Sequence, residues 1–225
     1  METAAFLKTL DYAILKPELG HESLAQAATL CRTAGVGCLC VKSVDVPLAA
    51  RLLEGSATAV AAVVGFPHGN VHPTVKALEA QLAVAEGAEE IDMVVNVAAL
   101  KDGDAEAVVR DIRAVVDAVR PFHVKVILET ALLTELEMQM GVGCAIAAGA
   151  EFVKTSTGFA PQGGATHEAV QILLDAAQGR VQVKASGGIR TREDAEAYLK
   201  QGCTRLGVGS VLPLLTHEER AVLGL

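Results

Sequence analysis

Residues Gly149-Ala-Glu-Phe-Val-Lys-Thr155 contain the pattern on which the fold prediction depends. A glycine is followed within a few residues by a short apolar run, and longer amphipathic stretches separate such runs. Glycine ends a helix well because it adopts the left-handed conformation without a Cβ clash. Five apolar runs follow a glycine: Cys38–Val41 after Gly35, Ile91–Val95 after Gly87, Phe152–Thr155 after Gly149, Val181–Lys184 after Gly179 and Arg205–Val208 after Gly202. The pattern predicts alternating helices and strands joined by short loops.

Three further apolar runs bring the predicted strands to eight, and they span Leu10–Leu15, Ala59–Val64 and Val124–Glu129. Eight strands with helical crossovers in 225 residues fit a closed (β/α)8 TIM barrel, which typically needs ~250 residues. A doubly wound open sheet is the alternative, but no GxGxxG motif follows the first strand. Because no linker or low-complexity segment divides the chain, we expect residues 1–225 to form a single α/β barrel domain.

The segments between the strands carry helix signals. Thr134-x-x-Glu137 and Thr191-x-x-Asp194 resemble capping boxes, which predicts helix starts after the fifth and seventh strands. One apolar helix face is predicted from the spacing i, i+4, i+7 and i+11 of Val108, Ile112, Val115 and Val119.

Composition restricts the class of protein. With 51% apolar and 20% charged residues, the chain can bury a substantial core, which excludes a disordered protein. Its net charge of -8 argues against binding nucleic acid through phosphate neutralisation, so an anionic substrate needs a local basic or amide-lined pocket. No apolar run reaches the ~20 residues of a membrane helix, and the segment from Met1 lacks the apolar core of a secretion signal. We therefore expect a cytoplasmic protein without a membrane partner.

Neither a disulfide framework nor a metal site is predicted. The chain has no CxxC spacing among its cysteines, which are Cys31, Cys38, Cys40, Cys144 and Cys203. His68 and His72 are four residues apart, but neighbouring prolines place them in a loop, and no third ligand is evident. Cys40 lies near a strand end and could be reactive, although a buried structural thiol is favoured.

Charged residues interrupt the predicted strands. Because strand side chains alternate between faces, Asp92, Lys154 and Lys184 should point into the barrel, together with Lys125 and Glu129. An interior network of lysines and carboxylates could be purely structural. However, Lys154 and Lys184 lie near the C-terminal ends of neighbouring strands, where the active sites of barrels lie. Clustering and desolvation favour loss of a proton from a lysine, and a neutral amine attacks carbonyl carbon, so the pattern predicts Schiff-base chemistry.

Two glycine-containing loops predict a phosphate site. Lys184-Ala-Ser-Gly-Gly-Ile-Arg-Thr191 and Arg205-Leu-Gly-Val-Gly-Ser210 follow the seventh and eighth strands. Barrels commonly bind phosphate there, because glycines let backbone amides approach a ligand and helix N-termini favour anions. The alternative is that these glycines only make tight turns.

The segments Phe152–Phe159 (FVKTSTGF) and Val183–Thr191 (VKASGGIRT) resemble the deoxyribose-phosphate aldolase family. Further matches follow in the family's order: Leu10–Pro17, Val64–Gly69, Glu90–Asn96 and Lys125–Thr130. The resemblance covers essentially the whole chain. It implies a class I aldolase on a (β/α)8 barrel that reversibly cleaves 2-deoxy-D-ribose 5-phosphate to D-glyceraldehyde 3-phosphate and acetaldehyde.

The resemblance also implies roles for individual residues. Lys154 would form the Schiff base, Lys184 would be the neighbouring ammonium that favours its neutral form, and Asp92 would transfer protons. Substrate or phosphate contacts are implied for Asp11, Thr157, Gly187, Gly188, Gly207, Gly209 and Ser210. No metal or cofactor is needed, because the protonated imine is the electrophile. The implied partners are a phosphorylated sugar and acetaldehyde, and a homo-oligomer is possible.

Three positions depart from the family pattern and bear on efficiency and substrate range. Tyr12-Ala13 follows Asp11 where the family has His-Thr, and Lys42-Ser43 stands in place of Asn-Pro. The chain ends without the tyrosine that some members use for proton exchange, a role that Tyr12 or solvent could take. Two alternative functions stay open: a metal-free barrel aldolase for another phosphorylated sugar, and a non-catalytic barrel that binds a sugar phosphate.

Overall fold

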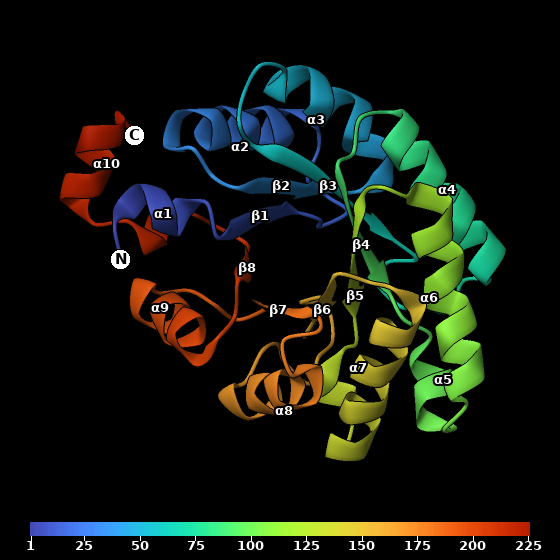
Figure 1. Cartoon of the computed structure of the whole chain (residues 1–225). Helices are drawn as coiled ribbons and strands as arrows, with labels where there is room; N and C mark the ends of the chain where they lie inside the picture. Colours follow the sequence, from blue (N-terminus) through green and yellow to red (C-terminus); the bar gives the residue numbers. More distant parts are fainter.

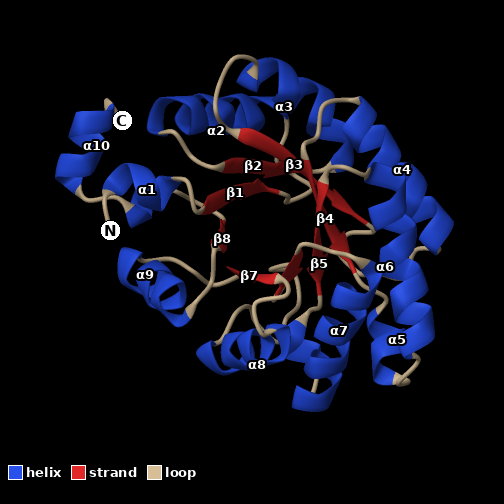
Figure 2. Ribbon diagram, in the orientation of Figure 1, coloured by secondary structure: helices blue, strands red, loops and turns tan.

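Eight parallel strands close into a barrel in the order β1 to β8 in the computed structural model, which describes all 225 residues. Helices surround the strands on the outside (Figures 1 and 2). The strands are β1 (Leu10–Ile14), β2 (Cys38–Val41), β3 (Ala59–Val64), β4 (Glu90–Val94), β5 (His123–Ile127), β6 (Phe152–Lys154), β7 (Gln182–Ser186) and β8 (Arg205–Val208). The predicted (β/α)8 barrel is confirmed.

Ten α-helices and three short 3-10 turns connect the strands. The helices are α1 (Thr3–Leu7), α2 (His21–Ala34), α3 (Val46–Leu53), α4 (Pro73–Ala85), α5 (Val97–Lys101), α6 (Ala105–Val119), α7 (Glu135–Ala148), α8 (His167–Ala177), α9 (Arg192–Gln201) and α10 (His217–Leu223). The turns are η1 (Ser43–Asp45), η2 (Thr130–Leu132) and η3 (Leu212–Leu214). None of the helices combines the length and the hydrophobicity that crossing a membrane would require.

Local sequence signals explain where the helices begin and end. Gly149, which ends α7, has φ 86°, a left-handed conformation that glycine adopts without strain. The predicted capping box at Thr134 forms completely, with both reciprocal hydrogen bonds between Thr134 and Glu137. At α9 the hydroxyl of Thr191 accepts from the backbone N–H of Asp194, but no return bond forms. The predicted apolar face is buried in α6.

Strands β2, β3 and β8 have the predicted bounds, and the other five differ from the predicted ones by one or two residues at one or both ends. One two-residue difference has a physical reason: β5 ends at Ile127, although the apolar run predicted a strand through Glu129. Glu129 has φ 58° and ψ 60°, the left-handed region, which is incompatible with an extended strand. The chain turns there into η2.

The barrel register brings the predicted interior residues opposite one another. Asp92 in β4 pairs with Lys125 in β5, and Lys154 in β6 pairs with Lys184 in β7. Residues on the other faces of these strands, such as Ile91 and Met93, pack against the helices in the main hydrophobic core. Side-chain alternation therefore directs Asp92, Lys125, Lys154 and Lys184 into the barrel, as predicted. The same prediction for Glu129 is wrong, because this residue lies beyond the end of β5 and its carboxylate bonds to Thr157 in the loop after β6.

The barrel interior has an apolar side and a charged side. The apolar side belongs to β1, β2, β3 and the residue after β1, and its buried residues are Leu15, Cys38, Cys40, Ala61 and Val63. The remaining interior is occupied by charged side chains from β1 and from β4 to β8. This division confines the ionic groups to one connected cluster.

A second buried ion pair lies outside the barrel and holds the end of β4. Lys76 in α4 is fully buried, and its Nζ donates to Oδ2 of Asp111 in α6 at 2.7 Å and to the carbonyl of Val94 at 2.8 Å. The same Asp111 oxygen accepts from the backbone N–H of Asn96 at 3.0 Å. The pair therefore ties two helices to the strand that carries Asp92.

We expect Asp111→Ala to lower the free energy of unfolding by about 3–5 kcal/mol, because it leaves Lys76 buried without a counter-charge. The double variant Lys76→Met/Asp111→Leu should recover much of that loss, since it replaces both charges with apolar side chains. Urea denaturation of the wild type and the variants measures the difference. A loss below about 1 kcal/mol for the single variant would contradict this account.

Candidate active site

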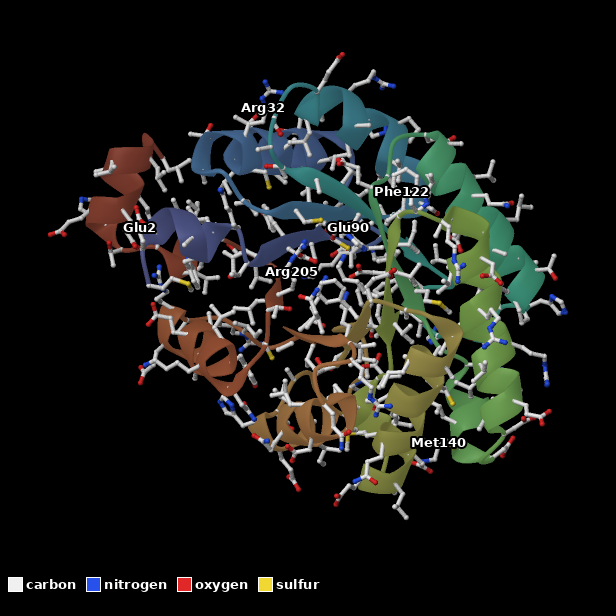
Figure 3. The ribbon with its side chains drawn as sticks, in the orientation of Figure 1. Glu2, Arg32, Glu90, Phe122, Met140 and Arg205 are labelled. Atoms are coloured by element: carbon white, nitrogen blue, oxygen red, sulfur yellow. The ribbon has the colours of Figure 1, made fainter.

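Seven charged side chains meet inside the barrel. They are Asp11 from β1, Glu90 and Asp92 from β4, Lys125 from β5, Lys154 from β6, Lys184 from β7 and Arg205 from β8. We call this set the interior charge cluster. Figure 3 shows Glu90 and Arg205 within the ring of strands, whereas Arg32 lies on the outside. The members come from six of the eight strands, so the cluster exists only when the barrel is closed.

Asp92 is the centre of the interior charge cluster. Its Oδ1 accepts from Nζ of Lys125 at 2.7 Å, and its Oδ2 accepts from Nζ of both Lys154 and Lys184, each at 2.7 Å. Burial alone would raise the pKa of Asp92, but Lys125, Lys154 and Lys184 hold the pKa well below its ordinary value. Asp92 is therefore a carboxylate that joins three lysines.

Asp11 and Glu90 form the second half of the network. Asp11 pairs with Lys184, and its Oδ1 accepts from Nε of Arg205 at 2.7 Å. Both Glu90 oxygens accept from the Arg205 guanidinium at 3.0 Å, and Oε2 also lies 2.6 Å from Nζ of Lys125. Burial raises the pKa of both carboxyls, but the surrounding cations more than offset this effect, so both stay ionised.

Lys154 differs from the other cations in its number of carboxylate partners. Lys154 contacts only Asp92, whereas Lys184 contacts two carboxylates and Lys125 contacts three. Burial lowers the pKa of Lys184, but Asp11 and Asp92 raise it above the ordinary value, so this lysine stays charged. Repulsion between two lysines was the expected cause of proton loss, but Asp11 and Asp92 hold Lys184 in its charged form, and Lys154 is the lysine of the cluster with a single carboxylate partner.

A cavity of about 700 Å³ opens above the interior charge cluster at the C-terminal ends of the strands. All but one of the predicted site residues line it: Asp11, Lys154, Thr157, Lys184, Gly187, Gly188, Gly207, Gly209 and Ser210. Asp92 is the exception, and it lies fully buried beneath the two lysines to which it is hydrogen-bonded. The predicted residues thus form one connected site.

The glycine loops after β7 and β8 form one wall of the cavity. Gly187 and Gly188 both have φ 85°, a conformation that favours glycine, and α9 begins shortly after them. Lys16 and Arg190 also line the cavity and supply positive charge at its mouth. The sequence analysis did not select these two cations, although Arg190 lies within the quoted glycine loop. An anion can therefore bind here despite the negative net charge.

Thr157 is held by Glu129 from the end of β5. The Glu129 carboxylate accepts from the backbone N–H of Thr157 at 3.3 Å and is paired with its hydroxyl. That hydroxyl also accepts from the backbone N–H of Phe159 at 3.0 Å. Burial raises the pKa of Glu129, and its hydrogen bonds to Thr157 act in the opposite direction. The left-handed backbone at Glu129 aims its side chain at the loop that follows Lys154.

Of the remaining polar candidates, Cys40 lines the cavity, whereas Tyr12 and Lys42 do not. Cys40 is buried, and burial raises its pKa to about 11, so it is a protonated thiol at neutral pH. Tyr12 packs against the main hydrophobic core and is not among the cavity residues, although Ala13 is. Lys42 is also absent from the lining: it donates to the carbonyl of Leu19 at 2.8 Å and lies 3.2 Å from Asp45. Tyr12 and Lys42 therefore do not face the cavity.

One group of potential metal ligands lies inside the barrel. The ligand atoms of Asp11, Cys38 and Glu90 lie within 4.8 Å of one another. Both carboxylates already pair with Lys125 and Arg205, which supply the positive charge that a metal would bring. His72, considered above as a ligand, instead caps α4 by accepting from the backbone N–H of Thr74 at 3.2 Å.

We expect Gly207→Ala to lower the free energy of unfolding by about 1–3 kcal/mol through overpacking. A Cβ at Gly207 would lie 2.6 Å from Cβ of Ser186 and 3.4 Å from Cε of Lys184. Gly209→Ala is the matched control, because its Cβ would meet nothing within 4 Å. Denaturation of both variants measures the difference, and equal stability of the two would show that Gly207 is not packed as described.

Comparisons with known proteins agree with this architecture. A family model described as DeoC/LacD family aldolase matches residues 11–208. Deoxyribose-phosphate aldolase of Corynebacterium glutamicum is 45% identical over 207 residues, which cover 92% of this chain and 93% of that protein. The solved structure "QR15, an Aldolase" has a TM-score of 0.90 at 36% identity and covers 97% of this chain and 96% of that one.

A further solved structure concerns assembly. It is described as a unique tetrameric structure of deoxyribose phosphate aldolase from Aeropyrum pernix. Its TM-score is 0.88 at 29% identity, and the match covers 95% of this chain and 90% of that one.

Proposed function

This chain belongs to the DeoC/LacD family of aldolases, and on that premise we propose that it reversibly cleaves 2-deoxy-D-ribose 5-phosphate to D-glyceraldehyde 3-phosphate and acetaldehyde. One observation carries the proposal: Lys154 and Lys184 share one oxygen of the buried Asp92 at the base of a cavity. This arrangement provides a nucleophilic amine, a fixed ammonium and a proton carrier within hydrogen-bond distance of one another.

The charge balance of the interior cluster supports Lys154 as the nucleophile. Four cationic side chains (Lys125, Lys154, Lys184 and Arg205) face three carboxylates (Asp11, Glu90 and Asp92), so the fully ionised cluster carries one surplus positive charge. Loss of one proton removes the surplus, and Lys154 has the fewest carboxylates to hold its proton. Its neutral amine is the form that attacks an aldehyde.

The reaction uses groups already in place. Nζ of Lys154 forms a bond to C1 of the open-chain sugar, and the carbinolamine loses water to give a protonated imine. The C3 hydroxyl loses its proton, the C2–C3 bond breaks, and its electron pair moves toward the imine nitrogen, which leaves an enamine. Protonation of the enamine carbon and hydrolysis release acetaldehyde. Asp92, whose Oδ2 lies 2.7 Å from Nζ of Lys154, carries protons in these steps.

The phosphate is proposed to bind at the cavity wall formed by the glycine loops after β7 and β8. Its ligands would come from the loop residues Gly187, Gly188, Gly207, Gly209 and Ser210. Backbone amides and the nearby start of α9 favour an anion, and Lys16 and Arg190 add local positive charge. Thr157 is proposed to contact the substrate beside Lys154. Asp11, which also lines the cavity, is proposed to contribute through its ion pair with Lys184.

The remaining proposals concern setting and assembly. The five cysteines are free and buried, which supports a reducing, cytoplasmic location. The interior charge cluster takes residues from β1 and from β4 to β8, so the first and last strands share one site, which supports one domain over residues 1–225. The partners of the protein are proposed to be the phosphorylated sugar and acetaldehyde rather than nucleic acid. The tetrameric Aeropyrum pernix relative supports a homo-oligomer for this chain as well.

Incubation with acetaldehyde and borohydride should attach a two-carbon group to Lys154 irreversibly, because borohydride reduces the imine. Peptide mapping by mass spectrometry identifies the modified residue. Lys154→Met should abolish the adduct, whereas the exposed Lys101→Met should leave it unchanged. No adduct on the wild type, or an adduct on a different lysine, would reject the assignment.

We expect Lys184→Leu to move the acidic limb of the pH–rate profile to higher pH. The substitution removes the surplus positive charge, so the charged form of Lys154 is no longer opposed and the amine becomes neutral only at higher pH. Steady-state rates across pH measure the shift, with Lys101→Leu as the surface control. Full activity with an unmoved acidic limb would contradict the paired-lysine mechanism.

A further inference from the structure

Glu90 and Arg205 lie at the end of the barrel opposite the cavity and take no part in the steps described above. Each is the first residue of its strand, β4 or β8, and neither lines the cavity. Their side chains are 11% and 16% exposed, and the two charges are joined by a bidentate ion pair. Removing two charges from water is costly unless both are well paired, and here each member of the pair also contacts a second opposite charge in the interior charge cluster.

Two chains of direct contacts lead from this ion pair to the reacting amine. In the first, Glu90 contacts Lys125 at 2.6 Å, Lys125 contacts Asp92 at 2.7 Å, and Asp92 contacts Lys154 at 2.7 Å. In the second, Arg205 contacts Asp11 at 2.7 Å, and Asp11 contacts Lys184. Lys184 in turn donates to Oδ2 of Asp92, the oxygen that also accepts from Lys154. Both chains therefore end on the carboxylate that holds Lys154.

We expect a change of charge at Glu90 or Arg205 to alter the electrostatic potential at Lys154, because the groups between them are buried and poorly screened, and Glu90 and Arg205 are themselves mostly buried. The fully ionised cluster has one surplus positive charge. Removing Glu90's charge raises the surplus to two, which disfavours protonated Lys154. Removing Arg205's charge cancels the surplus, which favours protonated Lys154.

We propose that Glu90 and Arg205 are positioning residues that set the protonation of Lys154 from the closed end of the barrel, Glu90 favouring the charged amine and Arg205 the neutral amine. The inference rests on the proposed function, because it assumes that Lys154 is the reacting amine. It assigns a chemical effect to two residues that contact neither the cavity nor the reacting atoms.

Other titratable groups also surround Lys154, and their own protonation must be distinguished from that of Lys154. They are Asp11 on β1, Cys38 and Cys40 on β2, Asp92 on β4, Lys125 on β5, Glu129 beyond β5, and Lys184 on β7. Burial raises the pKa of both thiols, so they stay protonated, and the carboxylates of the cluster stay ionised beside its cations. Burial lowers the pKa of Lys125, but three carboxylates raise it well above its ordinary value. Burial raises the pKa of Glu129, so an experiment has to distinguish its titration from that of Lys154.

The test compares Glu90→Gln, Arg205→Met and the double variant Glu90→Gln/Arg205→Met. The measured quantity is the pH dependence of acetaldehyde trapping on Lys154, followed by borohydride reduction and peptide mapping, together with the pH–rate profile for cleavage. Glu90→Gln should move the acidic limb about one pH unit lower, and Arg205→Met about one unit higher. The double variant restores the surplus of one and should lie close to the wild type.

Two controls separate charge from structural damage. Glu106→Gln removes a charge from the exposed surface of α6 and should leave the profile unmoved. Glu129→Gln shows whether the wild-type limb belongs to Glu129, in which case the limb disappears and the proposal fails. Thermal melting shows that each variant is folded at the temperature of the assay.

The outcomes distinguish this proposal from the proposed function. If the wild type forms no adduct on Lys154, the proposed function itself fails. If the adduct forms but both single variants shift the limb in the same direction, or neither shifts it, Glu90 and Arg205 are only structural. A double variant further from the wild type than either single variant would also overturn the proposal, because it would indicate additive damage instead of compensating charges.

Discussion

The carboxylate of Asp92 holds the functional part of this protein together. It is fully buried, and three lysines from three other strands donate to its two oxygens. Without it, Lys125, Lys154 and Lys184 would lie close together in a poorly solvated interior with too little opposing charge, which is strongly unfavourable. The strands that carry these lysines are neighbours, so the stability of the barrel and the geometry of the site depend on the same carboxylate. The Lys76–Asp111 pair, outside the barrel, fixes the end of the strand that carries it.

The two ends of the barrel differ in the groups that they carry. The open end, at the C-terminal ends of the strands, contains the cavity, and the closed end is the opposite one. At the open end, glycine loops and the cations Lys16 and Arg190 form a cavity suited to an anionic ligand. At the closed end, Arg205 and Glu90 complete the interior charge cluster. Lys154 lies between the two, with the fewest carboxylate partners and direct access to the cavity. This placement is the basis for proposing Lys154 as the reacting amine.

Much of the fold and of the site could be predicted from local sequence. The strand alternation was sufficient to direct Asp92, Lys154 and Lys184 inward, and the glycines marked the ends of helices. Glu90 and Arg205 obey the same alternation, two residues before Asp92 and Gly207, but a charged residue at the first position of a strand is also typical of an exposed strand end, so local sequence does not distinguish the two. The contact between Lys76 and Asp111 could not be predicted, because it joins two helices whose relative placement only the closed barrel defines. The left-handed backbone of Glu129 could not be predicted either, because the apolar run before it predicts an extended strand through this residue.

The surplus positive charge of the interior cluster bears on the bond-breaking step itself. In the proposed mechanism a neutral Lys154 amine leaves the interior balanced, but the iminium formed from it would restore a full positive charge next to Lys125 and Lys184. Cleavage converts that iminium to an uncharged enamine and so relieves the repulsion. In that mechanism the surrounding cations would favour movement of the electron pair toward nitrogen as the carbon–carbon bond breaks, an electrostatic contribution that is larger in the transition state than in the ground state.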